Sequence, residues 1–363
     1  MDRCVISYIL FCTIVFGTNA QQLILETGLD AGINETSGLL YLNNTLITHN
    51  DTDGTNQLFE VDTNTGNVTR TVTVTNASNG DWEDLTYDDT YIYIGDFGNY
   101  EGHRTDLKVY RIALADYFAN TSVMADIINF SYSNQTDFTP SPLATNYDAE
   151  GLIHYNNKLY VFSKNWLDGN TNIYELSKTP GTYSLSIIDT IAVQGLISGA
   201  TYNHLNGEIV LTGYGTNGSF LIQLSGFHSG LFSNGTVTKT IVGIPENYSP
   251  QIEGIAPTDA NAYFISAEEN SPASSGLYSF NTSTLDISNS EMLDFSFYPN
   301  PANEVITLNQ DNCNTRIYAV TGQLVKTSNY RHIDISELNS GVYFIRIEAT
   351  STGNSVTKQL IVE

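Results

Sequence analysis

The chain has 363 residues and a formal net charge of −25, which comes from 14 basic and 39 acidic residues. Binding to phosphates requires lysine and arginine, so we expect no nucleic-acid partner, and the same balance disfavours anionic membrane surfaces. A surface rich in carboxylates suits solubility or the binding of divalent cations.

The amino-terminal residues have the pattern of a secretory signal peptide. Arg3 precedes an apolar stretch at residues 5–17, and Thr18 and Ala20 supply the small residues of a cleavage site. We therefore predict a signal peptide at residues 1–20 with cleavage after Ala20. The apolar stretch is shorter than the roughly 20 residues of a membrane span, and no other stretch reaches that length, so we expect no transmembrane segment.

Cysteine usage agrees with this prediction. The sequence contains three cysteines, and Cys4 and Cys12 leave with the signal peptide. Only Cys313 remains in the mature chain, so no intrachain disulfide forms and stability must come from packing.

Residues 22–290 contain a weak internal repeat. Five segments begin alike, with Glu or Ser, then Gly or Asp, then small or aliphatic residues, and each is followed by two further runs of strand character. The intervals between their Gly or Asp positions are 46, 67, 48 and 55 residues. Units of this length with four short strands are typical of β-propeller blades, so we predict an all-β propeller domain at residues 21–290. The five segments begin at residues 36–41, 82–87, 149–154, 197–202 and 252–257.

The fifth unit has no fourth strand of its own before residue 290. Residues 22–26 are apolar enough to supply it, which would close the ring with the first strand of the mature chain. We therefore favour five blades. Six remain possible because the 67-residue interval could hold a degenerate unit, although residues 120–146 resemble an outer strand and a long loop. Residues 114–119 allow one short helical turn.

The propeller geometry predicts a site at one mouth of the central channel, where the innermost strands begin. Glu83, Glu150 and Glu253 occupy three of these starts, and Ser37 and Ser198 occupy the other two. Carboxylates brought this close repel or raise one another's pKa unless a cation neutralises them, and Ca²⁺ prefers oxygen ligands. The three glutamates are therefore candidate Ca²⁺ ligands, which is a hypothesis. Two alternatives stay open: hydrogen bonding to the backbone of neighbouring inner strands, and direct catalysis.

Loops between the second and third strands open on the same face of a propeller. The least ordinary of them runs from residue 96 to residue 104 and combines acidic, aromatic and basic side chains. The predicted ligand-binding face consists of Asp84, Asp96, His103, Arg104, Asp148, Lys164, Trp166 and Glu268.

Residues 294–363 carry a series of motifs at the carboxyl end. Pro299 and Pro301 stiffen the entry, and four short apolar runs rich in Ile, Val, Leu and Tyr follow, which predicts a small antiparallel β-sandwich. The motifs Phe297-Tyr-Pro-Asn-Pro, Ile317-Tyr-Ala-Val-Thr-Gly-Gln and Gly341-Val-Tyr-Phe-Ile-Arg-Ile, in this order, closely resemble the type A C-terminal sorting domain of type IX secretion cargo in Gram-negative bacteria.

This resemblance implies a partner and a route. Residues 294–363 would be recognised by the type IX secretion machinery, and the protein would pass through the periplasm and outer membrane to be secreted or held at the cell surface. No functional site is expected in this domain. A carbohydrate-binding or adhesion module of similar build is the alternative.

A second resemblance concerns the propeller. The starts Trp82-Glu-Asp-Leu, Glu150-Gly-Leu and Glu253-Gly-Ile look like those of secreted propellers related to phytase-like esterase domains. This resemblance covers short motifs alone. It implies that the three glutamates are metal ligands in a Ca²⁺-assisted ester or phosphoester hydrolysis. Two departures weigh against a phosphate substrate: serine stands at two of the five starts, and Arg104 and Lys164 are the only evident cations at the predicted mouth.

Two functions therefore follow from the sequence. We favour a secreted or cell-surface binding module, monomeric, whose ligand the sequence does not specify. The alternative is a Ca²⁺-dependent hydrolase of esters or phosphoesters. The binding module is favoured because the sequence has no Gly-x-Ser-x-Gly, His-Glu-x-x-His or Cys-x-x-Cys motif and only six histidines, so no catalytic residue is assigned.

Overall fold

The computed structural model describes residues 15–16, 21–51, 54–243, 250–269, 275–282, 296–311, 313–320, 323–349 and 355–363. The chain divides into two compact units, Met1–Thr282 and Ser283–Glu363. Apart from the two residues of β1 (Val15–Phe16), the predicted signal peptide and its cleavage point lie outside the described residues.

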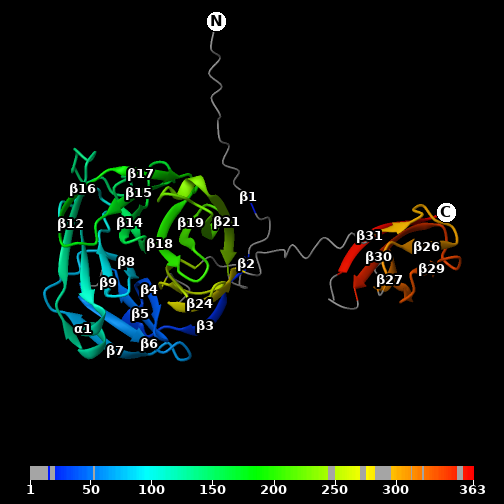
Figure 1. Cartoon of the computed structure of the whole chain (residues 1–363), viewed down its shortest axis with the longest axis horizontal. Coiled ribbons are helices and arrows are strands. Elements are labelled where there is room, and N and C mark those ends of the chain that lie inside the picture. The colour runs from blue at the N-terminus through cyan, green and yellow to red at the C-terminus, as the bar shows by residue number, and fades with distance from the viewer. Residues whose placement is uncertain are drawn as a thin grey trace, which may run out of the picture. The chain divides into compact units, whose positions relative to one another are not determined.

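The first unit contains five sheets among its described residues, each built on four antiparallel strands, and they follow one another along the chain (Figure 1). The first sheet is β4 (Thr36–Leu42), β5 (Thr45–Asn50), β6 (Gln57–Val61) and β7 (Val68–Val74). The second is β8 (Trp82–Tyr87), β9 (Tyr91–Asp96), β10 (Lys108–Ala113) and β12 (Asp126–Tyr132). The third is β13 (Ala149–Tyr155), β14 (Lys158–Ser163), β15 (Thr171–Leu176) and β17 (Ile187–Ile191). The fourth is β18 (Leu196–Asn203), β19 (Glu208–Gly215), β20 (Gly218–Ser225) and β21 (Thr236–Gly243). The fifth is β22 (Ile252–Pro257), β23 (Ala262–Ala267), β24 (Gly276–Asn281) and β3 (Ile24–Gly28).

The first strands of these sheets form a closed ring. Strand β4 adjoins β8, β8 adjoins β13, β13 adjoins β18, β18 adjoins β22, and β22 returns to β4. Sheets arranged radially around such a ring are the blades of a propeller. The described residues supply five of them, which is the number favoured from the sequence.

The ring is closed by β3, which precedes the first blade in the chain. Strand β3 pairs antiparallel with β24, with Gly28 opposite Gly276 and Ile24 opposite Ser279. Figure 1 shows the blue β3 beside the yellow β24. The predicted strand at 22–26 was placed two residues too early, because Gln21 and Gln22 form β2 (Gln21–Gln22), which pairs parallel with β21 instead.

The hydrophobic core lies between adjacent blades. One cluster joins Ile47 and Val72 of the first blade to Trp82 and Ile94 of the second. On β9, Ile94 belongs to this cluster, whereas Tyr93 belongs to the next one, shared with the third blade. Alternate residues of a strand point to opposite faces, so each blade contributes to two clusters.

The 67-residue interval between Asp84 and Gly151 holds a short helix, outer strands and a loop, as predicted, and no further blade among its described residues. Residues 114–119 form the single turn α1 (Leu114–Ala119), followed by β11 (Ser122–Val123), which extends the first blade beside β7. Strand β12 is the outer strand of the second blade, and β16 (Gly181–Leu185) adds to it in parallel. Short 3₁₀ turns lie at η1 (Ala31–Ile33) and η2 (Phe232–Asn234).

The second unit is a β-sandwich, in agreement with the prediction. One sheet holds β25 (Phe297–Tyr298), β26 (Val305–Leu308) and β29 (His332–Asp334). The other holds β27 (Cys313–Ala319), β28 (Leu324–Ser328), β30 (Gly341–Ala349) and β31 (Ser355–Val362). Their core contains Ile306, Ile317, Ile345 and Leu360. In the described part of the whole chain, no helix has the length and apolar character to cross a membrane.

Glycines at the blade starts allow the inner strands to approach closely. A Cβ atom on Gly254 would lie 2.2 Å from the backbone oxygen of Ser37 in the adjoining blade. Gly254→Ala must therefore displace one blade from the next, and we expect it to lower the free energy of unfolding by about 1–3 kcal/mol, as other overpacked sites do. Urea denaturation checks this. The matched control is Gly28→Ala, where the new Cβ would meet only Ser275 O at 3.9 Å; equal losses in the two variants would contradict the prediction.

Candidate functional site

The starts of the inner strands line a cavity of about 180 Å³ at one mouth of the channel. It contains seven carboxylates, and Lys164 is the only cationic side chain among its described lining residues. Tyr100, Leu143 and Trp166 provide apolar surface at the same cavity. We call this cavity the acidic mouth; its carboxylates are Asp51, Asp81, Glu83, Asp148, Glu150, Glu253 and Glu268.

A β-bulge at each blade start explains why these side chains enter the channel. The pairing of every inner strand with its neighbour shifts register there, for example between Trp82 and Asp84 and between Ala149 and Gly151. The extra residue of a bulge is unpaired and its side chain is re-aimed. Glu83 and Glu150 are the residues inside these two shifts.

The carboxylates are held away from water and close to one another. Burial raises the pKa of Glu150 to about 8, and it raises the pKa of Asp81 and of Glu268 to about 7, with neighbouring carboxylates adding to the effect. Burial also raises the pKa of Glu83 and of Glu253 well above the usual range, and Glu150 repels both. The acidic mouth therefore favours the uptake of protons or of a cation near neutral pH.

Glu253 has an unsatisfied acceptor in this cavity. Its side chain is 5% exposed, its Oε1 accepts a hydrogen bond from Gln251 Nε2 at 3.2 Å, and its Oε2 has no donor among the described residues. Glu268, which accepts a hydrogen bond from the same Gln251 amide, lies within hydrogen-bonding reach of Glu253, so the two carboxyl groups can share a proton. A carboxylate offers no hydrogen to a second carboxylate, so the buried Oε2 lacks a partner unless a proton or a cation is supplied.

Lys164 partly neutralises the acidic mouth. Its Nζ donates to Glu150 Oε1 at 2.9 Å and lies over the rings of Trp166 and Tyr214, at 5.3 and 5.2 Å from their centroids. Burial by itself lowers the pKa of Lys164, but Glu150 and the other carboxylates raise it well above its usual value, so the amine stays charged. One ammonium group cannot balance seven carboxylates.

Trp166 and Asp148 fix the wall beside this lysine. Trp166 Nε1 donates to Asp148 Oδ2 at 2.7 Å, and the backbone N–H of Asn99 donates to Asp148 Oδ1 at 2.6 Å. The indole is thus held in one orientation at the cavity. The four predicted face residues that line the acidic mouth are Asp148, Lys164, Trp166 and Glu268.

Three other predicted face residues do not line the cavity. Asp96 is fully buried in ion pairs with Arg104 at 2.7 Å and Lys108 at 3.3 Å. Arg104 also donates a hydrogen bond to the Gly98 carbonyl at 2.8 Å, so its guanidinium group is already paired. His103 lies outside the cavity, beside Glu101. The same loop contributes a glycine to the site. A Cβ on Gly98 would lie 2.0 Å from Glu83 Oε1, so the glycine is needed for the carboxylate to fit.

Asp84, the fourth of these predicted face residues, does not line the cavity either. It is 1% exposed, and its Oδ2 accepts hydrogen bonds from the backbone N–H groups of Leu152 at 2.7 Å and Ala200 at 3.0 Å, in the third and fourth blades. Its Oδ1 accepts from Leu85 N at 2.8 Å. The blade-to-blade role considered for the glutamates thus belongs to Asp84.

The serines at the two remaining blade starts have a similar structural role. Ser37 Oγ donates to the backbone oxygen of Glu83 at 2.5 Å, and Ser198 Oγ donates to that of Ile252 at 2.6 Å. Each bond links one blade to a neighbouring blade of the ring. Serine at these two positions therefore stabilises the contact between neighbouring inner strands.

Sequence reasoning missed Tyr100, Leu143 and Gln251 as lining residues. They come from segments outside the repeated strand pattern, so no repeat position marked them. Within the described residues, no group of three or more His, Cys, Asp or Glu side chains is already set to hold a metal ion.

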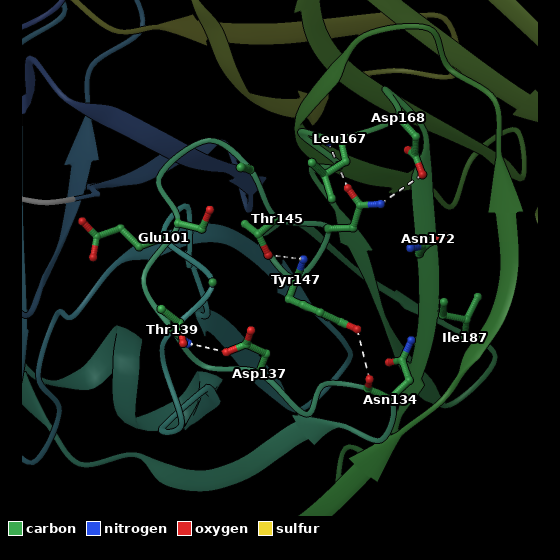
Figure 2. Close-up of a pocket in the computed structure, with 14 residues that line it drawn as sticks. Glu101, Asn134, Asp137, Thr139, Thr145, Tyr147, Leu167, Asp168, Asn172 and Ile187 are labelled. Atoms are coloured by element: carbon green, nitrogen blue, oxygen red, sulfur yellow. Dashed lines mark hydrogen bonds between the residues drawn. The ribbon is translucent and has the colours of Figure 1, made fainter.

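A separate hollow of about 570 Å³ lies between the loop that follows β12 and the third blade. Figure 2 shows that its polar groups largely bind one another: Tyr147 donates to the Asn134 backbone at 3.1 Å, and Thr139 N donates to Asp137 at 2.9 Å. Asn146, which lines the same hollow, donates to Asp168 at 3.0 Å. These bonds hold the loop against the blade.

Comparison with known proteins gives one family and several distant likenesses. The family of the secretion system C-terminal sorting domain matches residues 296–363. No curated protein matches the sequence. Among solved structures, the chain is similar to PorZ, a surface component of the type IX secretion system of Porphyromonas gingivalis, with 15% identity over 90% of this chain and 45% of that one and a TM-score of 0.31.

Two further likenesses are a quinonprotein alcohol dehydrogenase-like protein from Bacteroides thetaiotaomicron and an exo-β-1,3-galactanase from Phanerochaete chrysosporium. The first has 12% identity over 92% of this chain and 70% of that one, with a TM-score of 0.32. The second has 12% identity over 93% of this chain and 99% of that one, with a TM-score of 0.44. The chain spans less than half of the PorZ chain, and similarity at these levels assigns no activity.

Proposed function

We propose that this type IX secretion cargo, which carries its sorting domain at residues 296–363 and is exported to the cell surface or secreted, is a binding protein whose acidic mouth takes Ca²⁺. The observation that carries the proposal is the buried Oε2 of Glu253, an acceptor without a donor in a cavity that the same residue lines. A divalent cation would supply the missing partner.

The donor chemistry selects the kind of cation. The acidic mouth offers carboxylate oxygens and the side chain of Gln251, and Ca²⁺ takes six to eight oxygen ligands in flexible geometry. Glu83, Glu150 and Glu253 line the cavity from three blades, and their side chains would have to rotate to reach one ion, because no three such groups of the described residues are already set to hold a metal. Asp81 and Glu268, beside them, can complete the charge balance.

A bound ion would also create a place for a partner. Ca²⁺ keeps coordination positions for oxygen atoms that the protein does not supply, and a ligand's carboxylate or hydroxyl groups could fill them. Trp166 and Tyr100 line the same cavity and offer flat apolar surface to such a ligand. This combination of an ion and aromatic side chains fits recognition at the propeller face.

Ca²⁺-dependent hydrolysis of an ester or phosphoester is the second candidate. Lys164 Nζ, 2.9 Å from Glu150, is the observation that favours it, because an ammonium group next to a metal can hold an anionic substrate. Hydrolysis of p-nitrophenyl acetate or p-nitrophenyl phosphate that requires Ca²⁺ and is lost in Lys164→Met would support this candidate. Absence of both activities in the Ca²⁺-loaded protein would leave the binding role.

The Ca²⁺ proposal is tested by thermal unfolding of the secreted chain, first in EDTA and then with added Ca²⁺. A ligand at about 100 times its dissociation constant stabilises the native state by about 2.7 kcal/mol, so we expect a clear rise in Tm. Glu253→Gln combined with Glu83→Gln should abolish this rise. Glu208→Gln, at the start of β19 and outside the cavity lining, is the matched control and should keep it. No rise in the parent protein, or a full rise in the double variant, would refute Ca²⁺ binding at this mouth.

A further inference from the structure

A second hollow, of about 630 Å³, lies where three inner strands end. Strand β8 begins with Trp82 and Glu83 and ends at Tyr87, and β13 begins with Ala149 and Glu150 and ends at Tyr155, so this hollow and the acidic mouth lie at opposite ends of the strands. The two cavities share no described lining residue. We call the second one the aromatic pocket; its rings are Tyr87, His154, Tyr155, Tyr202 and His204.

The rings form a continuous arc across three blades. Tyr155 meets Tyr202 at 5.0 Å between centroids, Tyr202 meets His204 at 4.8 Å, and His204 meets Tyr87 at 5.8 Å, all in edge-to-face contact. Because the rings support one another, they are held in fixed orientations before any ligand arrives. Pre-oriented aromatic rings with few polar groups are characteristic of small-molecule pockets of 300–1,000 Å³.

His154 lies among these rings and has no hydrogen-bond partner. Both of its ring nitrogens are buried and unpaired in the structure. Burial lowers the pKa of His154 and of His204, so both imidazoles are neutral at physiological pH. A neutral imidazole carries one N–H donor and one acceptor nitrogen, which matches a hydroxyl group, itself both donor and acceptor.

Two acids line the pocket, and the buried one, Asp88, is already paired. Asp88 accepts hydrogen bonds from Lys178 Nζ at 2.7 Å and from Tyr93 Oη at 2.8 Å, as well as from two backbone N–H groups. It therefore has little capacity left for a cationic ligand. Asp89, Asn156 and Asn157 stand around the pocket and are polar groups suited to hydroxyls.

We propose that the aromatic pocket binds a neutral pyranose saccharide. The apolar C–H face of a pyranose ring stacks on Tyr202 or its neighbours, and the ring hydroxyls bond to Asp89 and to His154, whose covered ring nitrogens must turn toward the pocket as the sugar binds. Negative charge on the ligand is disfavoured because the pocket has no cationic side chain among its described lining residues. The buried acid Asp88 is already paired, so Asp89 is the carboxylate left for ligand hydroxyls. This site is independent of the Ca²⁺ proposal for the acidic mouth.

The test uses the whole secreted chain and four disaccharides that differ in ring configuration and linkage: cellobiose, maltose, lactose and mannobiose. We expect saturation-transfer difference signals from at least one of them and a measurable association constant by calorimetry. Binding should be the same in EDTA and in Ca²⁺, which separates this site from the acidic mouth.

Three variants locate the site. Tyr202→Leu keeps apolar contact with Tyr155 but removes the ring, and His154→Phe keeps the contact with Tyr93 but removes both nitrogens; each should weaken binding at least tenfold. His204→Ala changes an exposed side chain and should weaken binding without altering the melting temperature. His228→Ala, another exposed histidine, is the matched control. No signal from any of the four sugars, or binding that His204→Ala and Tyr202→Leu leave intact, would overturn the proposal.

Discussion

Asp84→Ala should destabilise the propeller by at least about 3 kcal/mol, the largest effect expected of any single substitution described above. The alanine would leave three buried backbone donors without an acceptor, those of Leu85, Leu152 and Ala200. Each unsatisfied buried donor costs about 1–3 kcal/mol, and the three lie in three different blades. Urea denaturation of the secreted chain measures the change in the free energy of unfolding.

Two comparisons make this test specific. Asp84→Asn keeps the shape but has one carbonyl oxygen, so its NH₂ group must face backbone donors; it should lose stability, though less than alanine. Asp126→Ala removes a carboxylate that pairs with Arg111 and is 56% exposed at its side chain, and exposed pairs contribute less than about 1 kcal/mol. Losses of similar size at residues 84 and 126 would show that Asp84 does not join the blades.

The fold could be predicted from the sequence because a propeller repeats its pattern. Five similar starts, each followed by strand-like runs, specify sheets whose inner strands must meet, and Gln22–Glu26 was recognised as apolar enough to close the ring. The predicted bounds of that closing strand, residues 22–26, lie two residues before those of β3. Its apolar pattern is short, and pairing of Gln21 and Gln22 with β21 is a tertiary contact that no local pattern reveals.

The site could be predicted only in part, for a related reason. Glu83 and Asp84 are adjacent in the sequence, yet one lines the acidic mouth and the other binds the backbone of two further blades. A β-bulge at this point decides which residue faces the cavity, and bulges have no clear signature in a single sequence. Asp96 and Arg104 were misassigned because each is the other's partner, a pairing that depends on how the loop folds back.

The second large effect concerns pH. In EDTA, the secreted chain should be most stable near pH 4 and lose stability as the pH rises to 8. Asp81 and Glu268 have a folded-state pKa of about 7 and Glu150 of about 8, against ordinary values of 3.8 and 4.5. Between pH 4 and 8 the native state therefore holds more protons than the unfolded chain. The free energy of unfolding then falls by up to about 1.4 kcal/mol per pH unit for each extra proton held.

Groups with the opposite shift act in a different range. Asp88 and Asp106 have a folded-state pKa of about 2, so their contribution is complete above pH 4 and is lost only as the pH falls below it. They set the acid limit of the stability optimum, and the acidic mouth sets its alkaline side. Urea midpoints at pH 5, 6, 7 and 8 in EDTA should thus decline steadily.

Added Ca²⁺ should change this profile at its alkaline end. An ion binds the deprotonated carboxylates, so it should restore more stability at pH 8 than at pH 5, where protons compete for the same oxygens. Glu150→Gln removes one of the titrating groups and should flatten the decline measured in EDTA, whereas Glu208→Gln should leave it unchanged. A flat or rising profile in EDTA would mean that the carboxylates of the acidic mouth are ionised in the folded protein without a cation, and the case for Ca²⁺ as their partner would fail with it.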